Sequence, residues 1–294
     1  MKEYTKGLVS IIIPTYNQGA YIKEAVNSCL TQSYKDIEII VVDDGSTDNT
    51  KEIMMPFIKE GVIKYIYQAN SERSAARNNG IRAAQGEFLQ FLDSDDLLDK
   101  EKIKMQVDFL NLHPEIFAVY GVSKQFKEHP GDFVLIKPKE LIGDISHELI
   151  KWNFITINAV VSRRDDIYFD ESLNTAEDWD YWLKLSLKGR KFAYMEQSVC
   201  YVRWHGSNTS HNKRLMLIGE LKVLEKTEAD YGSENMSGEK IKQLQDLITY
   251  GMFQRLYRLK NNNAMEKLYQ VLKINKKLFV KGLIFAVINL KNRC

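Results

Sequence analysis

LVSIIIPTYN, residues 8–17, indicates how this chain begins to fold. Its first six residues are rich in isoleucine and valine, a composition typical of a strand that is buried on both faces. A polar turn follows, and residues 21–30 then repeat apolar side chains at helical spacing. A buried strand, a short turn and an amphipathic helix form the first half of a β-α-β unit.

The same alternation continues for the next eighty residues or so. Strands are predicted at 38–42, 62–67 and 88–92, with helices near 49–59 and 74–84 between them. Apolar runs of this length, separated by helices, are typical of parallel strands. We therefore predict an α/β fold with a Rossmann-like, mixed and mostly parallel sheet flanked by helices.

Beyond Asp99 the alternation is less regular. Helices are predicted over 100–112, 140–151 and 177–188, and strands over 116–122, 133–136, 158–162 and 191–204. After about residue 208 only helical patterns remain, over 211–230, 238–260 and 264–290. We predict a catalytic domain over residues 1–210 and an all-helical C-terminal extension over residues 211–294.

The composition is that of an ordinary globular chain. The 294 residues are 44% hydrophobic and 27% charged with a net charge of +2, which excludes disordered and collagenous proteins and disfavours a nucleic-acid partner. No Cys-x-x-Cys motif occurs, and we expect Cys29 and Cys200 to be buried free thiols, with Cys294 far from both. With neither a signal peptide nor a spanning apolar run, the expected location is cytoplasmic.

Acidic clusters follow two of the predicted strands. Asp43-Asp44 comes after residues 38–42, and Asp93-Ser94-Asp95-Asp96 comes after residues 88–92. Turn and N-cap preferences explain either cluster alone. Two such clusters at one edge of a sheet repel each other unless a cation is bound, and oxygen ligands favour Mg²⁺ or Mn²⁺. No GxGxxG or GxxxxGK[ST] loop is present, which weakens dinucleotide and P-loop interpretations.

Four motifs in order resemble glycosyltransferase family 2, a family of inverting, nucleotide-sugar-dependent transferases with the GT-A fold. They are VSIIIPTYN at 9–17, VVDDGSTD at 41–48, ARNNGI at 76–81 and FLDSDD at 91–96. The resemblance covers about residues 7–208. It implies a hexosyltransferase-type enzyme that moves a sugar, most simply from a UDP-sugar, to a hydroxyl of a glycan, polymer or lipid-linked acceptor in cell-surface polysaccharide biosynthesis.

The resemblance also implies which residues bind the donor: Pro14, Thr15, Tyr16, Asp44, Arg77, Asp93 and Ser94. Asp44 would accept a hydrogen bond from the imide N–H of uracil. Arg77 would help to place the sugar diphosphate, unless it forms a structural ion pair instead. Asp93-Ser94-Asp95 matches the DxD motif, in which Asp95 would be the metal ligand, and the doubled acid leaves Asp96 as an alternative ligand.

The remaining site residues come from the second half of the chain. Glu177-Asp178 opens a predicted helix, where acidic residues also complement the helix dipole. Within the resemblance this pair matches the ED motif, so Asp178 becomes the general base, and Glu177 and Trp179 lie on the acceptor side. His205, which follows the last predicted strand, would complete the Mn²⁺ or Mg²⁺ site with Asp95.

The last predicted helical segment carries the positive charge of the chain. Residues 264–294 contain seven Lys or Arg and one acid, so their net charge is +6 and that of the preceding residues is −4. Its broad apolar content favours packing on the body or on a second subunit, or else an interfacial helix on anionic lipid. The expected partners are therefore a sugar donor, an acceptor, and either a membrane or a second copy, with a location at the inner face of the membrane in the lipid case.

Two other functions remain open at this level. A sugar-phosphate nucleotidyltransferase would share the sheet and the metal, although it would need phosphate-binding basic residues in the first loop, where Pro14–Asn17 offers none. An inactive nucleotide-sugar-binding assembly partner would not need Asp95, Asp178 and His205. The region from about residue 122 to 174 lies outside the four motifs, so the sequence identifies neither the sugar nor the acceptor.

Overall fold

The computed structural model describes residues 4–127, 129–206, 208–230 and 238–291. The chain forms two compact units. The first consists of Met1–Ile145, Phe154–Asn174 and Tyr181–Asn208, and the second of Ser146–Asn153, Thr175–Asp180 and Thr209–Cys294. The division at residue 210 stays a prediction, and the second unit also takes in two segments that come earlier in the chain.

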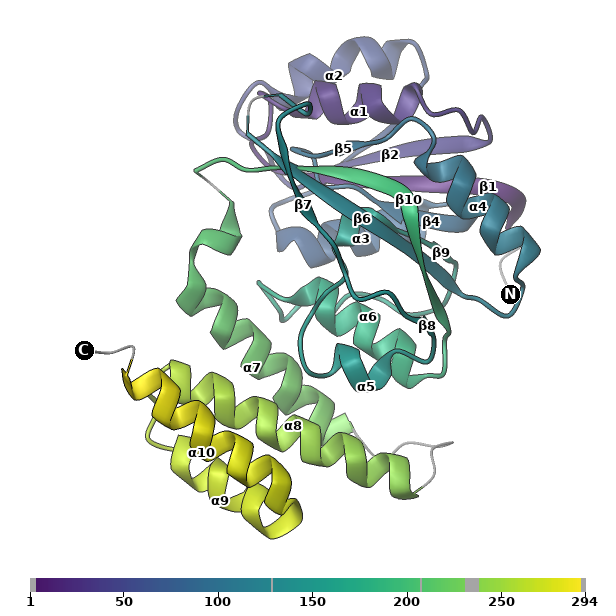
Figure 1. Ribbon diagram of the computed structural model, residues 1–294. Helices are drawn as coiled ribbons and strands as arrows, with labels where there is room; N and C mark the ends of the chain where they lie inside the picture. The colour runs from purple at the N-terminus through teal and green to yellow at the C-terminus, as the bar shows by residue number, and fades with distance from the viewer. Residues whose placement is uncertain (1–3, 128, 207, 231–237, 292–294) are drawn as a thin grey trace. The chain divides into compact units, whose positions relative to one another are not determined.

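The first unit contains a ten-stranded sheet (Figure 1), with the strand path β3-β2-β1-β4-β9-β6-β10-β5 and with β7 and β8 paired to β6 and β10. The strands are β1 (Thr5–Thr15), β2 (Ile37–Asp43), β3 (Lys64–Tyr67), β4 (Gly86–Phe91), β5 (Leu97–Leu98), β6 (Ala118–Phe126), β7 (Phe133–Ile136), β8 (Ile142–Gly143), β9 (Val160–Arg163) and β10 (Phe192–Arg203). Strands β3, β2, β1 and β4 are parallel, and β9 is antiparallel to both β4 and β6. The predicted mixed sheet is confirmed.

Alternate residues of β1 pack on opposite faces of the sheet. Val9, Ile11 and Ile13 belong to the core cluster formed with residues of α1 (Ile22–Leu30), α2 (Thr50–Lys59) and α4 (Lys102–Leu112). Ile12, which points the other way, meets Gly80 of α3 (Glu72–Ala83), where a Cβ atom would lie 2.3 Å from Ile12 Cγ2. Glycine at this position therefore lets α3 pack directly against the strand.

The predicted helix over 140–151 is wrong for most of its length. Only α5 (Ser146–Leu149) is helical, and the short strand β8 (Ile142–Gly143) precedes it. The backbone N–H of Leu141 donates to the Tyr120 hydroxyl (3.1 Å), and its carbonyl accepts from the Tyr194 N–H (3.0 Å). Because these sheet contacts use the backbone groups a helix would need, and Gly143 has a φ of 98°, the segment is extended.

The predicted helix over 264–290 is two helices, α9 (Ala264–Ile274) and α10 (Lys276–Lys291). Asn275 separates them in an extended conformation (φ −152°, ψ 97°). Its Oδ1 accepts a hydrogen bond from the Leu278 N–H (3.2 Å), and its Nδ2 donates to Asp246 Oδ2 (2.9 Å). Asn275 therefore caps α10 and fastens the junction to α8 (Gly238–Arg258).

The second unit is helical. Besides α5, α8, α9 and α10 it contains the 3₁₀ turn η2 (Thr209–His211), α7 (Lys213–Asp230) and the first turn of α6 (Glu177–Leu187). Arg255 of α8, which is 5% exposed, pairs with Glu220 (3.0 Å), donates to the Lys151 carbonyl (3.0 Å) and lies 5.4 Å from the ring of Trp179. One buried guanidinium thus connects four segments of this unit.

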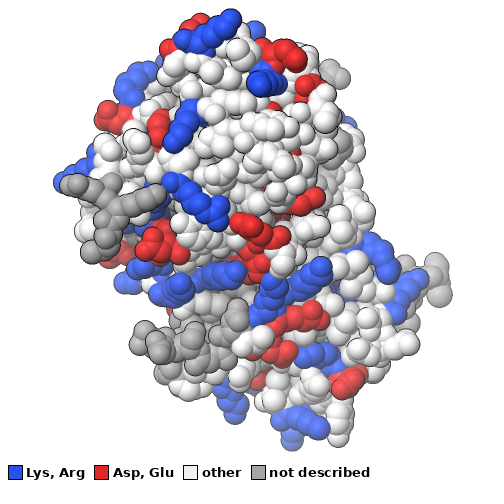
Figure 2. All heavy atoms as spheres, turned by 180° about the vertical axis from the view of Figure 1, so that it is seen from behind, with Lys and Arg blue, Asp and Glu red and all other residues white. Residues whose placement is uncertain are grey.

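Both signs of charge are mixed on the surface, and the two described cysteines are buried. Figure 2 shows Lys and Arg interspersed with Asp and Glu over one face of the molecule.

Cys29 and Cys200 are buried free thiols, as predicted, and burial raises their pKa values to about 12 and about 11. Cys294 lies outside the described residues. In the part of the chain that the structure describes, no helix combines the length and the apolar character needed to cross a membrane.

A fully buried lysine lies in the core of the first unit. Lys102 of α4 is 0% exposed, and its Nζ donates to Gln106 Oε1 (2.7 Å) and to Gln90 Oε1. Burial lowers the pKa of Lys102 to about 7, an effect that the nearby Cys29 and Cys200 offset only in part. Two neutral carbonyl oxygens thus stand where a buried ammonium ordinarily finds a carboxylate.

We expect Lys102→Met to change how stability depends on pH. Because the pKa of Lys102 is about 7 in the folded chain and about 10.4 when unfolded, the unfolded state binds more protons between these values. The stability of the wild type relative to Lys102→Met should therefore rise by about 2 kcal/mol between roughly pH 7.5 and 9.5. Denaturant unfolding at a series of pH values measures the free energy of unfolding of both proteins. Lys104→Met, at an exposed position of the same helix, should give a curve parallel to wild type, and parallel curves for Lys102→Met would contradict the expectation.

Candidate active site

The first part of the candidate site lies where β1 and β2 end. The Asp44 N–H donates to the Thr15 carbonyl (2.8 Å) and joins the two strand ends. Asp44 is 3% exposed, and its Oδ1 accepts from Gln68 Nε2 (2.7 Å) and from the Ser71 N–H (2.9 Å). These contacts fix the orientation of the Asp44 carboxylate.

The turn after β1 is held by Asn17. Its φ of 52° lies in the left-handed region, which asparagine tolerates better than most residues. Its Oδ1 accepts hydrogen bonds from the N–H groups of Thr47 (2.8 Å) and Asp48 (3.3 Å), which belong to the loop after β2. The preceding residue, Tyr16, is 47% exposed and is therefore presented on a fixed turn, while Pro14 is buried.

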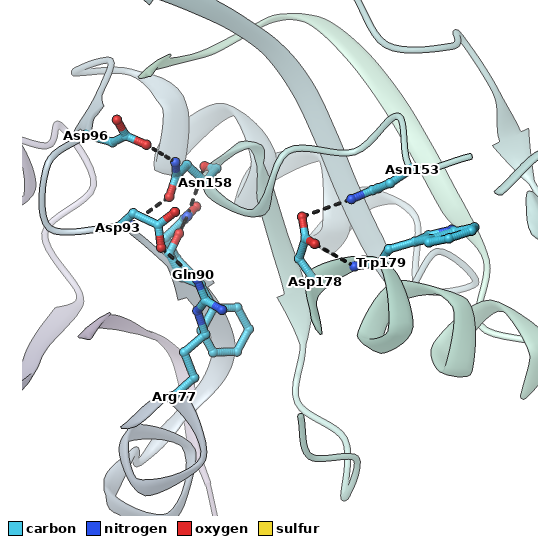
Figure 3. A network of polar contacts seen from close by, with 9 residues as sticks. Arg77, Gln90, Asp93, Asp96, Asn153, Asn158, Asp178 and Trp179 are labelled. Atoms are coloured by element: carbon cyan, nitrogen blue, oxygen red, sulfur yellow. Dashed lines mark hydrogen bonds and ion pairs between the residues drawn. The ribbon is translucent and has the colours of Figure 1, made fainter. Parts of the chain in front are cut away.

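The second part of the site lies at the end of β4. Asp93 Oδ1 pairs with Arg77 Nη2 of α3 at 2.7 Å (Figure 3). The Arg77 side chain is 2% exposed and its guanidinium lies 5.3 Å from the ring centre of Phe169, whereas the Asp93 side chain is 35% exposed. Arg77 thus forms the ion pair that the sequence left open, and it fixes a carboxylate that solvent can reach. Ser94, next to Asp93, is buried.

Asp95 and His205 form a close pair. His205 Nε2 lies 2.9 Å from Asp95 Oδ2, and the two side chains are 14% and 17% exposed. The imidazole stacks on the ring of Tyr21 with a centroid distance of 5.0 Å, and the His205 N–H donates to Asn208 Oδ1 (2.6 Å). Stacking and the backbone bond hold the His205 ring in place beside the carboxylate.

Asp96 is used inside the protein. It is 4% exposed, its Oδ1 accepts from the Arg203 N–H (2.7 Å), and its Oδ2 accepts from Asn158 Nδ2. Figure 3 shows the Asn158 amide between Asp93 and Asp96. Both Asp96 oxygens therefore have protein donors, which leaves Asp95 as the better candidate for a ligand to a bound ion.

The acidic turn after β4, residues Asp93–Asp96, is electrostatically suited to a divalent cation. Burial and then the neighbouring Asp93 raise the pKa of Asp95, and burial followed by Asp95 and Asp93 raises the pKa of Asp96 well above its usual range. Within the described residues no three His, Cys, Asp or Glu side chains form a metal cluster. Mg²⁺ and similar ions often take only one or two protein ligands and complete their coordination with substrate phosphates and water. Asp95 supplies a carboxylate for a site of that type, and the His205 imidazole lies beside it as a second possible donor.

Asp178 lies in the second unit, in the first turn of α6. Its Oδ1 accepts from the Trp179 N–H (2.8 Å) and its Oδ2 accepts from Asn153 Nδ2 (2.9 Å), as Figure 3 shows. The indole N–H of Trp179 donates to the Leu149 carbonyl (2.7 Å), so Trp179 is buried against α5. Glu177, also of this unit, is 5% exposed. Helix and neighbouring loop together fix the Asp178 carboxylate.

The predicted site residues therefore fall into two groups. Those at the ends of β1, β2, β4 and β10, together with Arg77 of α3, belong to the first unit, and Glu177, Asp178 and Trp179 belong to the second. Sequence reasoning missed Asn158 and the role of Arg203, which donates from Nε to the Asp95 carbonyl (3.0 Å) and pairs with Glu24 (2.7 Å). Arg203 stands two residues before His205, and that proximity was the only signal in the sequence.

Comparisons with known proteins find glycosyltransferases. The family model described as "Glycosyl transferase family 2" matches residues 10–165. An uncharacterized glycosyltransferase of Rickettsia typhi (strain ATCC VR-144 / Wilmington) is 37% identical over 235 residues, which cover 76% of this chain and 72% of the relative. TuaG of Bacillus subtilis (strain 168), named for teichuronic acid biosynthesis, is 32% identical over 71% of this chain and 83% of its own length.

Other relatives are much longer than this chain. An uncharacterized glycosyltransferase of Rickettsia conorii (strain ATCC VR-613 / Malish 7) is 33% identical over 76% of this chain, and the match spans 39% of that relative. The similarity thus concerns one part of the longer protein.

Solved structures share the fold. S. aureus TarS residues 1–349, in complex with UDP-GlcNAc, matches with a TM-score of 0.71 at 19% identity and covers 96% of this chain and 89% of that chain. The mannosyltransferase PcManGT of Pyrobaculum calidifontis, in complex with GDP-Man and Mn²⁺, matches with a TM-score of 0.64 at 18% identity over 95% and 80% of the two chains. These likenesses confirm the predicted GT-A type of sheet.

Proposed function

The chain belongs to glycosyltransferase family 2, and from this premise we propose that it transfers a sugar from a UDP-sugar to a hydroxyl group, with inversion. The observation that carries the proposal is the acidic turn after β4, where Asp93 is fixed by Arg77 and Asp95 by His205. TuaG and the UDP-GlcNAc complex of TarS support a UDP-linked donor and an acceptor in cell-surface polysaccharide, whether glycan, polymer or lipid-linked.

The nucleoside would bind at the ends of β1 and β2. Because Asp44 Oδ1 is held by Gln68 and Ser71, its other oxygen would accept from the imide N–H of uracil. The Thr15 hydroxyl at the same strand end is buried and has no hydrogen-bond partner among the described residues, so a bound nucleoside would supply one. Pro14 and Tyr16 would flank it.

The diphosphate would lie against the acidic turn. Mn²⁺ or Mg²⁺, held by Asp95 and His205, would offset the negative charge of the leaving nucleoside diphosphate. Asp93, which Arg77 holds in place, and the neighbouring Ser94 would contact the donor where its ribose joins its diphosphate, and so orient it. The turn would thereby hold the donor in a fixed orientation toward the acceptor. Such orientation of two substrates contributes a large part of the rate enhancement in a transfer reaction.

Asp178 would act as the general base on the acceptor. Inversion by direct displacement requires one carboxylate to accept the proton of the attacking hydroxyl. Asn153 and the Trp179 N–H donate to the two oxygens of Asp178 and so fix its orientation. Glu177 and Trp179 would shape the acceptor side.

A thermal-shift panel tests the donor class. UDP-, GDP- and other nucleotide sugars are each measured with and without Mn²⁺. We expect stabilisation by UDP-sugars that requires the metal, because a ligand that binds only the folded state raises the melting temperature. Equal stabilisation by all nucleotides, or none by any of them, would contradict the proposed donor. Release of pyrophosphate from a nucleoside triphosphate and a sugar phosphate would instead indicate a nucleotidyltransferase.

We also propose that α10 contacts an anionic membrane surface, which would place the enzyme at the inner face of the membrane. One face of α10 packs into the helical core through Phe279, Phe285 and Ala286. The other face is apolar as well but exposed: Val280, Leu283, Ile284, Val287 and Ile288 are each 41–54% exposed. A helix that is apolar all round is ordinarily covered on all sides.

Charge favours lipid over a second copy as the partner of α10. Lys276, Lys277 and Lys281 are exposed on α10, and no described carboxylate pairs with them. A second copy placed on this face would bring further lysines and no acid from α10, whereas anionic headgroups would pair with the ammonium groups.

Replacing Lys276, Lys277 and Lys281 by serine together should weaken binding to phosphatidylglycerol vesicles by roughly 100-fold, at about 1 kcal/mol for each lysine. Co-sedimentation measures it, with phosphatidylcholine vesicles as the neutral surface. The matched control replaces Lys23, Lys51 and Lys59, three exposed lysines of the first unit, by serine. Equal binding by both triple variants, or a dimer in light scattering that requires the α10 lysines, would contradict a lipid partner.

A further inference from the structure

Asn158 contacts the acidic turn, although it belongs to none of the four sequence motifs. It belongs to the 3₁₀ turn η1 (Ile157–Ala159), which leads into β9. Because β9 pairs antiparallel with β4, with Gln90 opposite Val161, the residues before β9 lie beside the residues that follow β4. Asn158 is 1% exposed, so its polar atoms must find partners within the protein.

The side-chain amide of Asn158 bridges the two ends of the turn. Its Oδ1 accepts from the Asp93 N–H (2.8 Å), and its Nδ2 donates to Asp96 Oδ2. An amide can do both, because it carries an acceptor and a donor on one planar group. The first and fourth residues of the turn are thereby held at one distance from each other (Figure 3).

A buried chain of polar groups fixes Asn158 in turn. Its backbone carbonyl accepts from Gln90 Nε2 (3.0 Å), and Gln90 Oε1 accepts from the buried Lys102 ammonium. Gln106, which also binds Lys102, donates to the carbonyls of Val119 (3.0 Å) and Ala159 (2.9 Å). Buried polar groups of the sheet core therefore hold the Asn158 amide in place. Losing one hydrogen bond of this network would leave a buried polar group without a partner and lower the stability of the fold.

Further hydrogen bonds connect Asp96 to Asp95 and His205, the proposed metal ligands. Asp96 Oδ1 accepts from the Arg203 N–H (2.7 Å), and Arg203 Nε donates to the Asp95 carbonyl (3.0 Å). His205 follows two residues later and meets Asp95 at 2.9 Å. Asn158 thus acts on Asp95 and His205 through Asp96 and Arg203, without touching either.

We propose that Asn158 is a positioning residue that sets the geometry of the Asp93–Asp96 turn for binding a divalent cation and a nucleoside diphosphate. The inference rests on the proposed function. Contacts one step behind a metal ligand typically contribute about 10–100-fold to metal affinity. Asn158→Asp keeps the shape but places a second carboxylate against Asp96, so it should weaken Mn²⁺-dependent UDP binding by about 10-fold or more.

The decisive variant exchanges the two side chains, Asn158→Asp with Asp96→Asn. Aspartate at 158 would accept from the Asp93 N–H and from the new amide at 96, whose oxygen would still accept from the Arg203 N–H. All three hydrogen bonds and the net charge are conserved. We therefore expect the exchange to restore UDP and Mn²⁺ affinity to within a few-fold of wild type, although Asn158→Asp and Asp96→Asn each lose it.

Titration calorimetry of UDP at fixed Mn²⁺, together with melting temperatures, measures the effect. Asn275→Asp is the matched control, since Asn275 also bridges a carboxylate and a backbone N–H but lies in the second unit. It should lower the melting temperature and leave UDP binding unchanged. Wild-type affinity in Asn158→Asp overturns the inference, as does an exchange that restores the melting temperature without the affinity. Absence of UDP binding by the wild type would contradict the proposed function itself.

Discussion

Asp178→Asn is expected to lower the rate of sugar transfer by roughly 10²–10⁴-fold, the usual contribution of a general base. The change keeps the shape of the side chain, and the amide oxygen can still accept from the Trp179 N–H. Because the proposed role of Asp178 is to accept a proton from the acceptor hydroxyl and not to bind the donor, UDP affinity should stay within a few-fold of wild type. Transfer kinetics with UDP-sugar and calorimetry with UDP measure the two quantities separately.

Asp166→Asn serves as the control for Asp178→Asn, since it removes the same charge from an exposed position of the first unit. It should leave both quantities unchanged. Equal losses of transfer and of UDP affinity in Asp178→Asn would mean that Asp178 binds the donor or supports the fold, and would remove it from the role of base.

The parallel half of the sheet could be predicted because its signals are local. Val9, Ile11 and Ile13 alternate with Ser10 and Ile12 on the opposite face, and polar turn residues follow the strand within a few positions. The two failures have a different origin. Leu141 is extended because Tyr120 and Tyr194, which are distant in sequence, bind its backbone, and the tail helix breaks where Asn275 reaches Asp246 on another helix. Tertiary contacts decide both segments.

The site divides in the same way. The acids after β2 and β4 could be grouped from sequence, since parallel strands bring their carboxyl ends to one edge of a sheet. The resemblance names Asp95 as the metal ligand and leaves Asp96 as the alternative, because the contacts that occupy both oxygens of Asp96 come from Asn158 and Arg203. Those residues reach the turn through the antiparallel pairing of β9 with β4 and the pairing of β10 with β6, and neither pairing has a local signal.

Asp95→Asn and Asp96→Asn should therefore differ, although the two acids are neighbours. Asp95→Asn removes the charge of the proposed ligand, so the apparent Kd for Mn²⁺ in the presence of UDP should rise by more than about 100-fold, beyond the range for supporting contacts. Asp96→Asn should cost about tenfold, because it disturbs the bridge and leaves Asp95 in place. Calorimetry with Mn²⁺ and UDP measures both variants.

The exchange variant extends the comparison to the cause of each loss. Asn158→Asp should rescue Asp96→Asn, because the pair regains its donor and acceptor, and should not rescue Asp95→Asn, because no neighbouring side chain returns a charge to that position. Asp108→Asn, a half-exposed carboxylate paired with Lys104, controls for the loss of one charge from the first unit. A larger loss in Asp96→Asn than in Asp95→Asn would reverse the assignment and make Asp96 the ligand, with His205 then bound to an acid that only supports the turn.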